Sequence, residues 1–282
     1  MRPCLLAVHA HPDDESSKGA GTVARYAAAG VHCVLVCCTG GEEGSILNPA
    51  MERPEVAERL HEVRLDELAE AARIIGYHET VMLGYRDSGM PETEANARVD
   101  NFANAPLEEA VGRLVAILRR ARPQVVLTYG EDQKGYPHPD HLRVHEVTMA
   151  AVAAAADPAQ HAEAGPPWQV AKVYWSVWSR ARILGLHDKF LELGLESPYS
   201  PEWLERASQD DTITTSVGIH GFEDVRRDAL LAHATQVDPT SPFWFGLPWD
   251  VARTVHPYDD WVLASSTVAA ELPESDLFAG LS

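Results

Sequence analysis

Short apolar runs alternate with longer helical patterns along the first 178 residues of the chain. The runs are rich in Val, Leu and Tyr, as is typical of strands that are buried on both faces. They lie at residues 4–8, 33–39, 80–83, 125–129 and 173–177, and helical patterns cover residues 18–29, 54–75, 106–122 and 140–156. Strands that alternate with helices predict an α/β fold, in which right-handed crossovers place helices on both faces of a mostly parallel sheet.

The pattern over residues 54–75 is the clearest of these helices. Pro54 suits a first helical turn, and Gly76 is a typical stop. The apolar positions between them share one stripe, which consists of Val56, Leu60, Val63, Leu68, Ala71 and Ile75. Such a stripe is expected to face the core, with the polar side of the helix in solvent.

The pattern becomes less regular after residue 178. Helices are expected near residues 180–194, 201–207 and 223–235, and a strand over 212–217. The tail carries Trp244, Trp249 and Trp261 among many prolines, and we expect it to wrap the core or to wall a pocket. No internal repeat or linker is visible. The prediction is therefore one domain over residues 1–282, with an α/β core at 1–178 and a C-terminal part at 179–282 that covers the core and walls the pocket.

The length and the cysteine content favour a protein of a reducing compartment. A chain of 282 residues can bury a large core without disulfides, and three of its four cysteines lie in or beside one apolar stretch. The apolar segment near the N-terminus is too short for a signal peptide, and no run reaches the roughly 18 apolar residues of a membrane span. We therefore expect a cytoplasmic protein that does not enter a membrane.

The formal charge of −19 bears on the choice of partner. It would repel nucleic-acid phosphates and anionic lipids, and no basic patch is visible in the sequence, so nucleic-acid binding is not expected. A small or cationic ligand fits better, although an acidic excess can also serve solubility alone. The sequence makes no prediction of the oligomeric state.

Two loops rich in histidine and aspartate follow the first and the fourth predicted strands. The first reads HAHPDDES (residues 9–16) and the second reads GYPHPDH (residues 135–141). Parallel strands align their carboxyl ends at one edge of the sheet, so these loops are expected to meet in space although they are far apart in the chain. Together they offer His9, His11, Asp13, Asp14, His138, Asp140 and His141.

This set of side chains indicates a catalytic metal site. Catalytic zinc takes three protein ligands plus a water, and two imidazoles with one carboxylate meet that count. Hydrolysis also needs a base beside that water, so Asp13 and Asp14 are expected to divide the work as ligand and proton acceptor, in an order that spacing leaves open. The competing interpretation, in which the aspartates only cap helices, suits one such loop better than a pair of them.

The paired motifs resemble those of the zinc-dependent N-deacetylases of the LmbE-like family, also called the PIG-L family. The likeness runs through most of the chain, in the segments VHAHPDDESSKGA, TGGEEGSILNPAMERPEV, GYRDSGMPE, YPHPDHLRVHEV and LLAHATQVDP. These segments look most like the actinobacterial branch that acts on mycothiol conjugates and on the glucosaminyl-inositol precursor of mycothiol. The resemblance implies a Rossmann-like fold.

The resemblance also implies a role for each residue of the site. It implies His11, Asp14 and His141 as zinc ligands, although iron(II) would accept the same set. It implies Asp13 as the general base. It further implies that His138 steadies the oxyanion and can protonate the leaving amine, and that Tyr136 helps to polarise the carbonyl. His9 and Asp140 are left to support the ligands or to cap helices.

Further residues are expected at the substrate. By resemblance, Glu43, Arg64 and Asp87 would hold the glucosamine and inositol hydroxyls. Lys18 resembles the amidases of the branch, because the deacetylases tend to carry a small polar residue there. Three of these residues have a plainer alternative: Arg64 and Lys18 as solvated charges, and Asp87 as the partner of Arg86. Two further histidines are interpreted otherwise than as ligands: His233 either walls the pocket or is a core histidine, and His145 either packs or supports the ligands.

The expected function is zinc-dependent hydrolysis of a small-molecule amide. The preferred substrate is a mycothiol S-conjugate, a glucosaminyl-inositol thiol conjugate that is split into a mercapturate (an N-acetylcysteine S-conjugate) and glucosaminyl-inositol. The alternatives within the family are a deacetylase of the N-acetylglucosaminyl-inositol precursor and a secondary-metabolism amidase that trims a mycothiol adduct. A sugar-binding module without turnover is disfavoured because ligands and base are all present. A serine hydrolase is disfavoured because the chain has no Gly-x-Ser-x-Gly motif.

Overall fold

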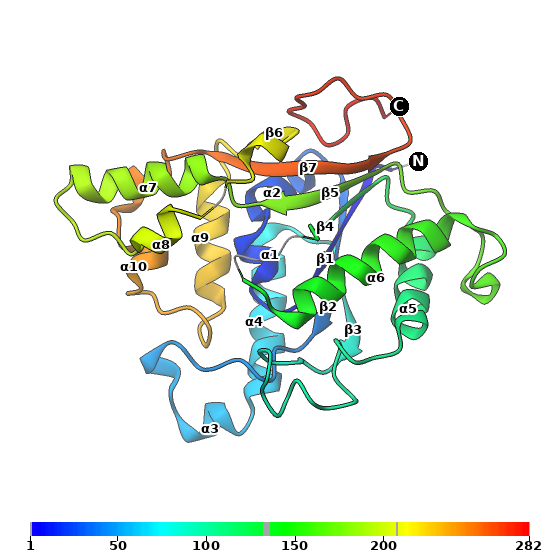
Figure 1. Cartoon of the computed structure of the whole chain (residues 1–282), viewed down its shortest axis with the longest axis horizontal. Helices are drawn as coiled ribbons and strands as arrows, with labels where there is room; N and C mark the ends of the chain where they lie inside the picture. The colour runs from blue at the N-terminus through cyan, green and yellow to red at the C-terminus, as the bar shows by residue number, and fades with distance from the viewer. Residues whose placement is uncertain (1, 132–135, 207, 282) are drawn as a thin grey trace.

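The computed structural model describes residues 2–131, 136–206 and 208–281. Within them, seven strands form one sheet in the order β3-β2-β1-β4-β5-β7-β6 (Figure 1). The strands are β1 (Cys4–His9), β2 (His32–Thr39), β3 (Glu79–Tyr85), β4 (Val125–Tyr129), β5 (Lys172–Val177), β6 (Thr215–Gly218) and β7 (Tyr258–Ser266). The first five are parallel, whereas β7 runs antiparallel to both β5 and β6. The predicted α/β fold with a mostly parallel sheet is confirmed.

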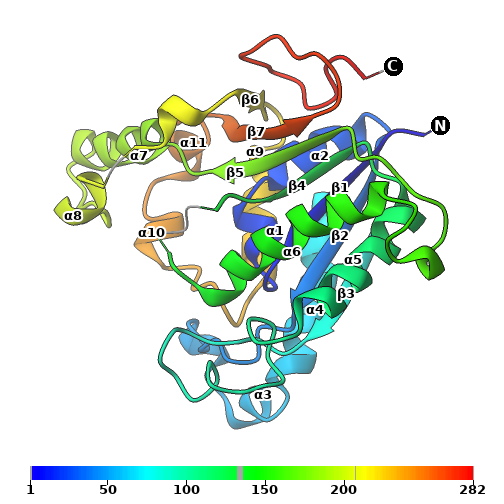
Figure 2. The same ribbon diagram turned by 45° about the vertical axis from the view of Figure 1, so that its right-hand side comes forward.

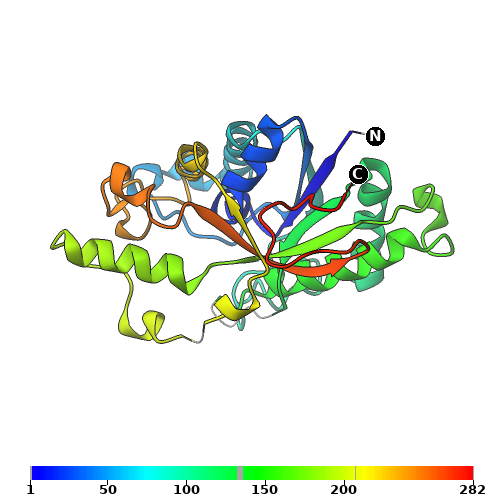
Figure 3. The same cartoon turned by 90° about the horizontal axis from the view of Figure 1, so that it is seen from above.

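Helices cover both faces of this sheet, as Figure 3 shows. On one face lie α2 (Ala20–Ala28), α4 (Leu60–Ile75) and α9 (Glu223–Ala232), and on the other lie α5 (Leu107–Ala121) and α6 (Pro139–Ala156). Successive strand residues point to opposite faces, and β1 therefore contributes Leu5 and Ala7 to the first layer but Leu6 and Val8 to the second. The core has two halves, with β1 buried between them.

The strand order reverses direction between β1 and β4. The chain moves outward from β1 to β2 and β3, then returns to the other side of β1 to form β4 and β5 (Figure 2). The loops after β1 and β4 consequently leave the sheet in opposite directions at the carboxyl ends of the strands. Open α/β sheets bind ligands in a crevice at this position, and this edge of the sheet is here called the crevice. Both histidine- and aspartate-rich loops begin at this crevice.

Two predicted helices are interrupted where the structure requires a turn. The segment 54–75 divides into α3 (Pro54–Ala57) and α4, and the segment 18–29 begins only at α2, after the short α1 (Asp14–Ser17). Gly19 separates α1 from α2 with a φ of 95°, and a Cβ there would lie 2.6 Å from the Trp261 ring. Only glycine fits this close approach.

The C-terminal part contains more regular structure than the sequence predicted. Strand β7 was missed altogether, because Asp259 and Asp260 near its start look like loop residues, yet both are buried in ion pairs. The expected strand 212–217 begins later, as β6. The expected helices 180–194 and 201–207 are α7 (Arg180–Glu192) and α8 (Pro201–Leu204), with residue 207 outside the described residues. The short α10 (Pro242–Phe245) and α11 (Trp249–Ala252), and single 3-10 turns at Pro49–Met51, Ala162–Ala164 and Asp210–Thr212, complete the elements.

Two other sequence expectations can be compared with the structure. Cys4, Cys33, Cys37 and Cys38 are buried free thiols, so packing rather than disulfide bonding accounts for them. No helix within the described ranges has the length and apolarity needed to cross a bilayer.

We expect Asp260 to make the stability of the fold depend on pH. Burial raises the pKa of its carboxyl, but hydrogen bonds from His256, Ser179 and Ser216 outweigh burial and hold the pKa below its usual value. A carboxyl with a depressed folded-state pKa stabilises the fold above its unfolded-state pKa, near 4, and loses that contribution as the pH falls through the folded-state value. Asp260→Asn should lower the free energy of unfolding by about 1–3 kcal/mol at pH 7.

Urea unfolding at pH 7 and at several values below pH 4 measures this effect. The variant should lose less stability on acidification than the wild type. Asp66→Asn, at an exposed position of α4, is the control and should follow the wild type. If the free energies of unfolding of the wild type and of Asp260→Asn fall equally with pH, the assigned role of this carboxylate is contradicted.

Candidate metal centre and active site

The loop after β1 turns sharply so that two adjacent aspartates point in different directions. Pro12 ends the strand pairing, and Asp13 adopts a left-handed conformation with a φ of 112°. The Asp13 carbonyl then accepts hydrogen bonds from the amides of Ser16 and Ser17, which begins α1. A positive φ is uncommon for a residue other than glycine, although aspartate tolerates it better than most. This turn places Asp14 in the first turn of α1 and leaves Asp13 ahead of it.

The second loop leads directly into α6. His138 caps this helix, since its Nδ1 accepts a hydrogen bond of 3.2 Å from the Asp140 amide, and Pro139 occupies the first helical position. Proline is favoured there because its missing N–H is not needed by the helix. His138 and His141 are three residues apart and thus lie on one face of the helix start. Gly135, the first residue of the second motif, lies outside the described residues.

His11, Asp14 and His141 come together at the crevice, and their ligating atoms all lie within 4.8 Å of one another. Asp14 Oδ2 is 3.5 Å from His11 Nδ1 and 3.4 Å from His141 Nε2. His141 Nε2 is buried and has no hydrogen-bond partner among the described residues. Burial also lowers the pKa of His141, which favours the neutral imidazole that binds metals. Two nitrogens and one carboxylate oxygen, one of them an orphaned buried atom, fit a divalent cation such as zinc.

A second group shares His11 with the first. His11 Nε2 lies 3.1 Å from Asp140 Oδ2 and 3.6 Å from Asp87 Oδ1, and His138 is the fourth member. Asp140 is itself held by the Ser88 amide and hydroxyl. Burial lowers the pKa of His11, but its hydrogen bonds to Asp14, Asp140 and Asp87 raise it well above the usual value. The carboxylates thus orient the His11 ring and concentrate negative charge where a cation would bind.

Asp13 belongs to neither group. No hydrogen bond or ion pair involves its carboxylate within the described part of the chain, although its amide donates to Glu15 Oε2 over 2.9 Å. Burial and the negative charge of Asp14 raise the pKa of Asp13 to about 7. A half-buried carboxyl with such a pKa is suited to accept a proton near neutral pH.

His138 and Tyr136 lie beside the three clustered residues. Burial and the neighbouring His11 lower the pKa of His138 to about 4, so the ring is neutral near pH 7. Because its Nδ1 accepts from the Asp140 amide, the neutral ring carries its proton on Nε2 and is a donor. The Tyr136 ring is 54 % exposed, with its centroid 5.9 Å from that of His138 and 5.3 Å from that of His141.

Comparisons with known proteins place this arrangement in a family. The family model for GlcNAc-PI de-N-acetylases, named PIG-L, matches residues 6–152. A mycothiol S-conjugate amidase of Streptomyces coelicolor is 45 % identical over 98 % of this chain and 97 % of its own length. The chain belongs to the PIG-L family. It is accordingly a hydrolase that acts on C–N bonds, and the resemblance seen in its motifs is confirmed.

Two further relatives of this PIG-L protein bear on its activity and fold. A deacetylase of 1D-myo-inositol 2-acetamido-2-deoxy-alpha-D-glucopyranoside from Streptomyces avermitilis is 40 % identical over 98 % of the chain and 97 % of its own length. The solved structure of N,N'-diacetylchitobiose deacetylase from Pyrococcus horikoshii has a TM-score of 0.62 and 19 % identity, and the match covers 92 % of this chain and 82 % of that one. At that identity the likeness concerns the fold alone.

A buried ion pair supports the Asp13 turn of this PIG-L chain and was not anticipated. Glu15 Oε1 lies 2.6 Å from His233 Nε2, with both side chains fully buried, and Glu15 Oε2 accepts from the Asp13 amide. Burial disfavours both charges, but their mutual attraction lowers the pKa of Glu15 and raises that of His233. The pair fastens α1 to the end of α9. The sequence singled out His233, but only the fold reveals its partner.

Lys18 lies beside the candidate metal ligands rather than on the protein surface. Its Nζ is 2.5 Å from Asp14 Oδ1 and 5.5 Å from the centroid of the Tyr129 ring. The attraction of Asp14 outweighs burial and raises the pKa of Lys18. The ammonium is therefore charged and next to one of the three clustered residues, which excludes the interpretation as a solvated surface charge.

The residues expected at the sugar lie on the β2 and β3 side of the crevice. Asp87 is buried, with its Oδ1 3.6 Å from His11 Nε2, and it accepts a hydrogen bond from the Gly89 amide. Arg86 forms its ion pair with Glu43 rather than with Asp87. Arg64 is buried instead of solvated, and its Nη2 donates to the carbonyls of the adjacent loop, those of Gly44 and Ser45. Asp87 thus lies at the cluster, while Arg64 shapes the loop that carries Glu43.

His9 and His145, the other two histidines considered in the sequence analysis, form hydrogen bonds away from the three clustered residues. His9 Nδ1 lies 3.3 Å from the Tyr129 hydroxyl, and His145 Nδ1 lies 3.0 Å from the Tyr129 carbonyl. The Tyr129 ring in turn stacks on His141, with centroids 4.7 Å apart. Both histidines therefore pack around the strand end that supports His141, and neither joins the ligating groups found among the described residues.

Proposed function

We propose that this chain is a zinc-dependent amidase that cleaves mycothiol S-conjugates into a mercapturate and glucosaminyl-inositol. The observation that carries the proposal is the convergence of His11, Asp14 and His141, with the Asp13 carboxylate left free beside them. The 45 % identity to an amidase of this specificity over nearly the whole chain supports the choice of substrate. The lysine at position 18, next to Asp14, supports it as well.

In this proposal His11, Asp14 and His141 hold the metal ion, and iron(II) would accept the same ligands. Zinc bound there acts as a Lewis acid and lowers the pKa of its water. Asp13 takes a proton from the attacking water, and His138 donates its Nε2 proton to a hydrogen bond with the developing oxyanion. The Tyr136 hydroxyl polarises the carbonyl from the solvent side. Asp13 then passes this proton to the glucosamine nitrogen, which leaves as an amine. His138 does not supply it, because the single proton of its neutral ring is engaged with the oxyanion.

The substrate lies across the crevice in a defined direction. Glu43 and Asp87, on the β2 and β3 side, would face the glucosaminyl-inositol half. Lys18 pairs with Asp14 and lines a cavity with residues of β5 and β7, across β1 from β2 and β3. It would face the acyl half, where its ammonium can bind the cysteinyl or N-acetyl carbonyl. The proposed C-terminal part, residues 179–282, then walls the acyl side.

The rival function is deacetylation of the N-acetylglucosaminyl-inositol precursor, which the relative at 40 % identity favours. Both reactions would use the same metal ligands and base. Amine release by the zinc-loaded protein from an S-conjugate and from the precursor should differ by at least about tenfold in kcat/KM, in favour of the conjugate, because only the conjugate fills an acyl-side pocket. Protein stripped with a chelator is the blank. Faster hydrolysis of the precursor would instead establish the deacetylase.

A further inference from the structure

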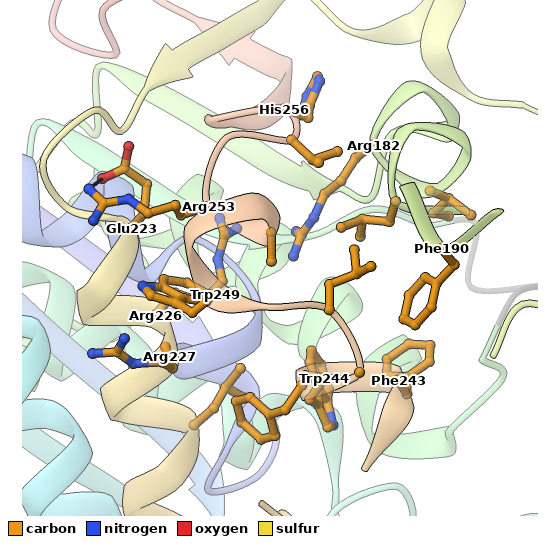
Figure 4. A pocket seen from close by; sticks show the side chains of 18 of the residues that line it. Arg182, Phe190, Glu223, Arg226, Arg227, Phe243, Trp244, Trp249, Arg253 and His256 are labelled. Carbon is orange, nitrogen blue, oxygen red and sulfur yellow. Dashed lines mark hydrogen bonds and ion pairs between the residues drawn. The ribbon is translucent and has the colours of Figure 1, made fainter. Parts of the chain in front are cut away.

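A cavity lies among the helices of the C-terminal part, between α7, α9, α10 and α11 (Figure 4). The space enclosed by its lining side chains is about 80 Å³, and the cavity is open to solvent. Much of its wall is aromatic, with Trp178, Phe190, Phe243, Trp244 and Trp249 among the lining residues. A wall of this aromatic character suits a flat apolar group.

Four arginines line the same cavity, and three of them are already paired with carboxylates. The pairs are Arg226 with Asp259, Arg227 with Asp224 and Asp228, and Arg253 with Glu223 and Asp224. The Arg182 guanidinium makes no hydrogen bond or ion pair with any residue that the structure describes. Its guanidinium carbon lies 5.1 Å from the centroid of the Trp178 ring. In Figure 4 its side chain reaches into the cavity.

Asp259 and Asp260, the two carboxylates whose charges act on Arg182, form their hydrogen bonds and ion pairs with other residues. Asp259 Oδ2 accepts hydrogen bonds from the amide and the hydroxyl of Thr22, and Asp260 Oδ2 lies 2.5 Å from His256 Nε2. Burial and the charge of Arg226 lower the pKa of Arg182 to about 10 and outweigh the opposing charges of Asp259 and Asp260. An unpaired cation in a chain of formal charge −19 leaves room for an anionic ligand.

Arg182 also connects this cavity with the metal centre. A second, smaller cavity is lined by Trp178 and Arg182, which it shares with the first, and by Ser17 and Lys18. Lys18 in turn contacts Asp14. This shared lining gives the direction in which we place a ligand whose carbonyl lies at the metal centre, from Lys18 toward Arg182 and the aromatic walls. This is the direction of the acyl half, away from Glu43 and Asp87.

We propose that the aromatic cavity binds the sulfur-linked substituent of the conjugate, and that Arg182 pairs with an anionic group on that substituent. The inference rests on the proposed amidase function. It names the substrate class as conjugates of aromatic, acidic electrophiles, whose ring lies against Trp178, Phe243 and Trp244 while its carboxylate meets the guanidinium. Arg182 is a specificity-determining residue in this account and takes no part in the chemical step.

The test uses two mycothiol conjugates that differ by one carboxylate, the S-benzyl and the S-(4-carboxybenzyl) conjugate. The zinc-loaded wild type should hydrolyse the carboxybenzyl conjugate with a kcat/KM about tenfold higher, the effect expected of one charge-assisted pair. Arg182→Gln should abolish the preference, so that the ratio of kcat/KM between the two conjugates falls to about one. Arg182→Lys keeps the charge but loses the planar fork, and should retain part of the preference.

Lys189→Gln is the matched control. This cation is on the same helix, α7, and pairs with Glu192 at the surface without lining the cavity. It should keep the full preference of the wild type. A wild type that does not distinguish the two conjugates would overturn the proposal, as would a preference that survives Arg182→Gln.

A binding measurement separates this proposal from the proposed function. Calorimetric titration with N-acetyl-S-benzylcysteine and with N-acetyl-S-(4-carboxybenzyl)cysteine measures the acyl side directly, whichever amide the enzyme cleaves. Tighter binding of the carboxybenzyl compound that is lost in Arg182→Gln supports the cavity even if only the N-acetyl precursor is hydrolysed, a result that would refute the amidase assignment alone. Equal affinities would overturn the cavity proposal while leaving the amidase assignment intact.

Discussion

Replacing Asp13 with asparagine is expected to slow amide hydrolysis by about a thousandfold or more while the protein keeps its metal. Asparagine has nearly the same shape as aspartate and tolerates the left-handed backbone found at this position, where φ is 112°. It cannot accept the proton of the attacking water. Since Asp13 lies outside the group formed by His11, Asp14 and His141, metal binding should survive. Amine release measures the loss of hydrolysis, and the metal content of the same preparation measures whether the metal is retained.

His11→Ala provides the contrast to the Asp13 variant, because it should lose the metal as well as the activity. The two variants together separate a base from a ligand. An Asp13→Asn protein that retains more than about a tenth of the wild-type rate would show that another group takes the proton, since a general base contributes at least about a hundredfold.

Lys172→Met is expected to destabilise the fold by about 3–5 kcal/mol, because it leaves a buried carboxylate without its counter-charge. Lys172 Nζ lies 2.5 Å from Glu274 Oε1, and the two side chains are 0 % and 1 % exposed. Glu274 also accepts from the Tyr174 hydroxyl, and its backbone bonds to Thr214 and Ser216. The pair therefore ties the C-terminal tail to β5 and β6, and urea unfolding should reveal its loss.

The double variant Lys172→Met/Glu274→Gln tests the physical reason. Removing both charges avoids the isolated carboxylate, so the double variant should be more stable than Lys172→Met alone. Lys189→Met breaks an exposed pair with Glu192 and should change the free energy of unfolding by less than about 1 kcal/mol. A double variant that is less stable than Lys172→Met would contradict the interpretation.

The parallel core and the meeting of the two loops could be predicted from the sequence because both depend on local patterns. Runs such as 125–129 are apolar on both faces, and parallel strands necessarily align their carboxyl ends. That logic brings His11 and His141 together across 130 residues of chain without knowledge of any side-chain contact.

Features that depend on pairing in three dimensions could not be predicted. Strand β7 carries Asp259 and Asp260 near its start, and they look like loop residues until their partners Arg226 and His256 are known. Glu15 and His233 are 218 residues apart and are polar in sequence, yet they form one of the most buried contacts of the site. The unpaired state of Arg182 depends on where the neighbouring carboxylates find their partners, which a sequence does not record.

The metal content of the purified protein tests the central claim most directly. After supplementation with zinc and removal of the excess, elemental analysis of the well-folded wild type should find one transition-metal ion per chain, and His141→Ala should bind far less. A folded, metal-supplemented wild type that contains no bound transition metal would contradict the account, because His11, Asp14 and His141 would then not form a metal site.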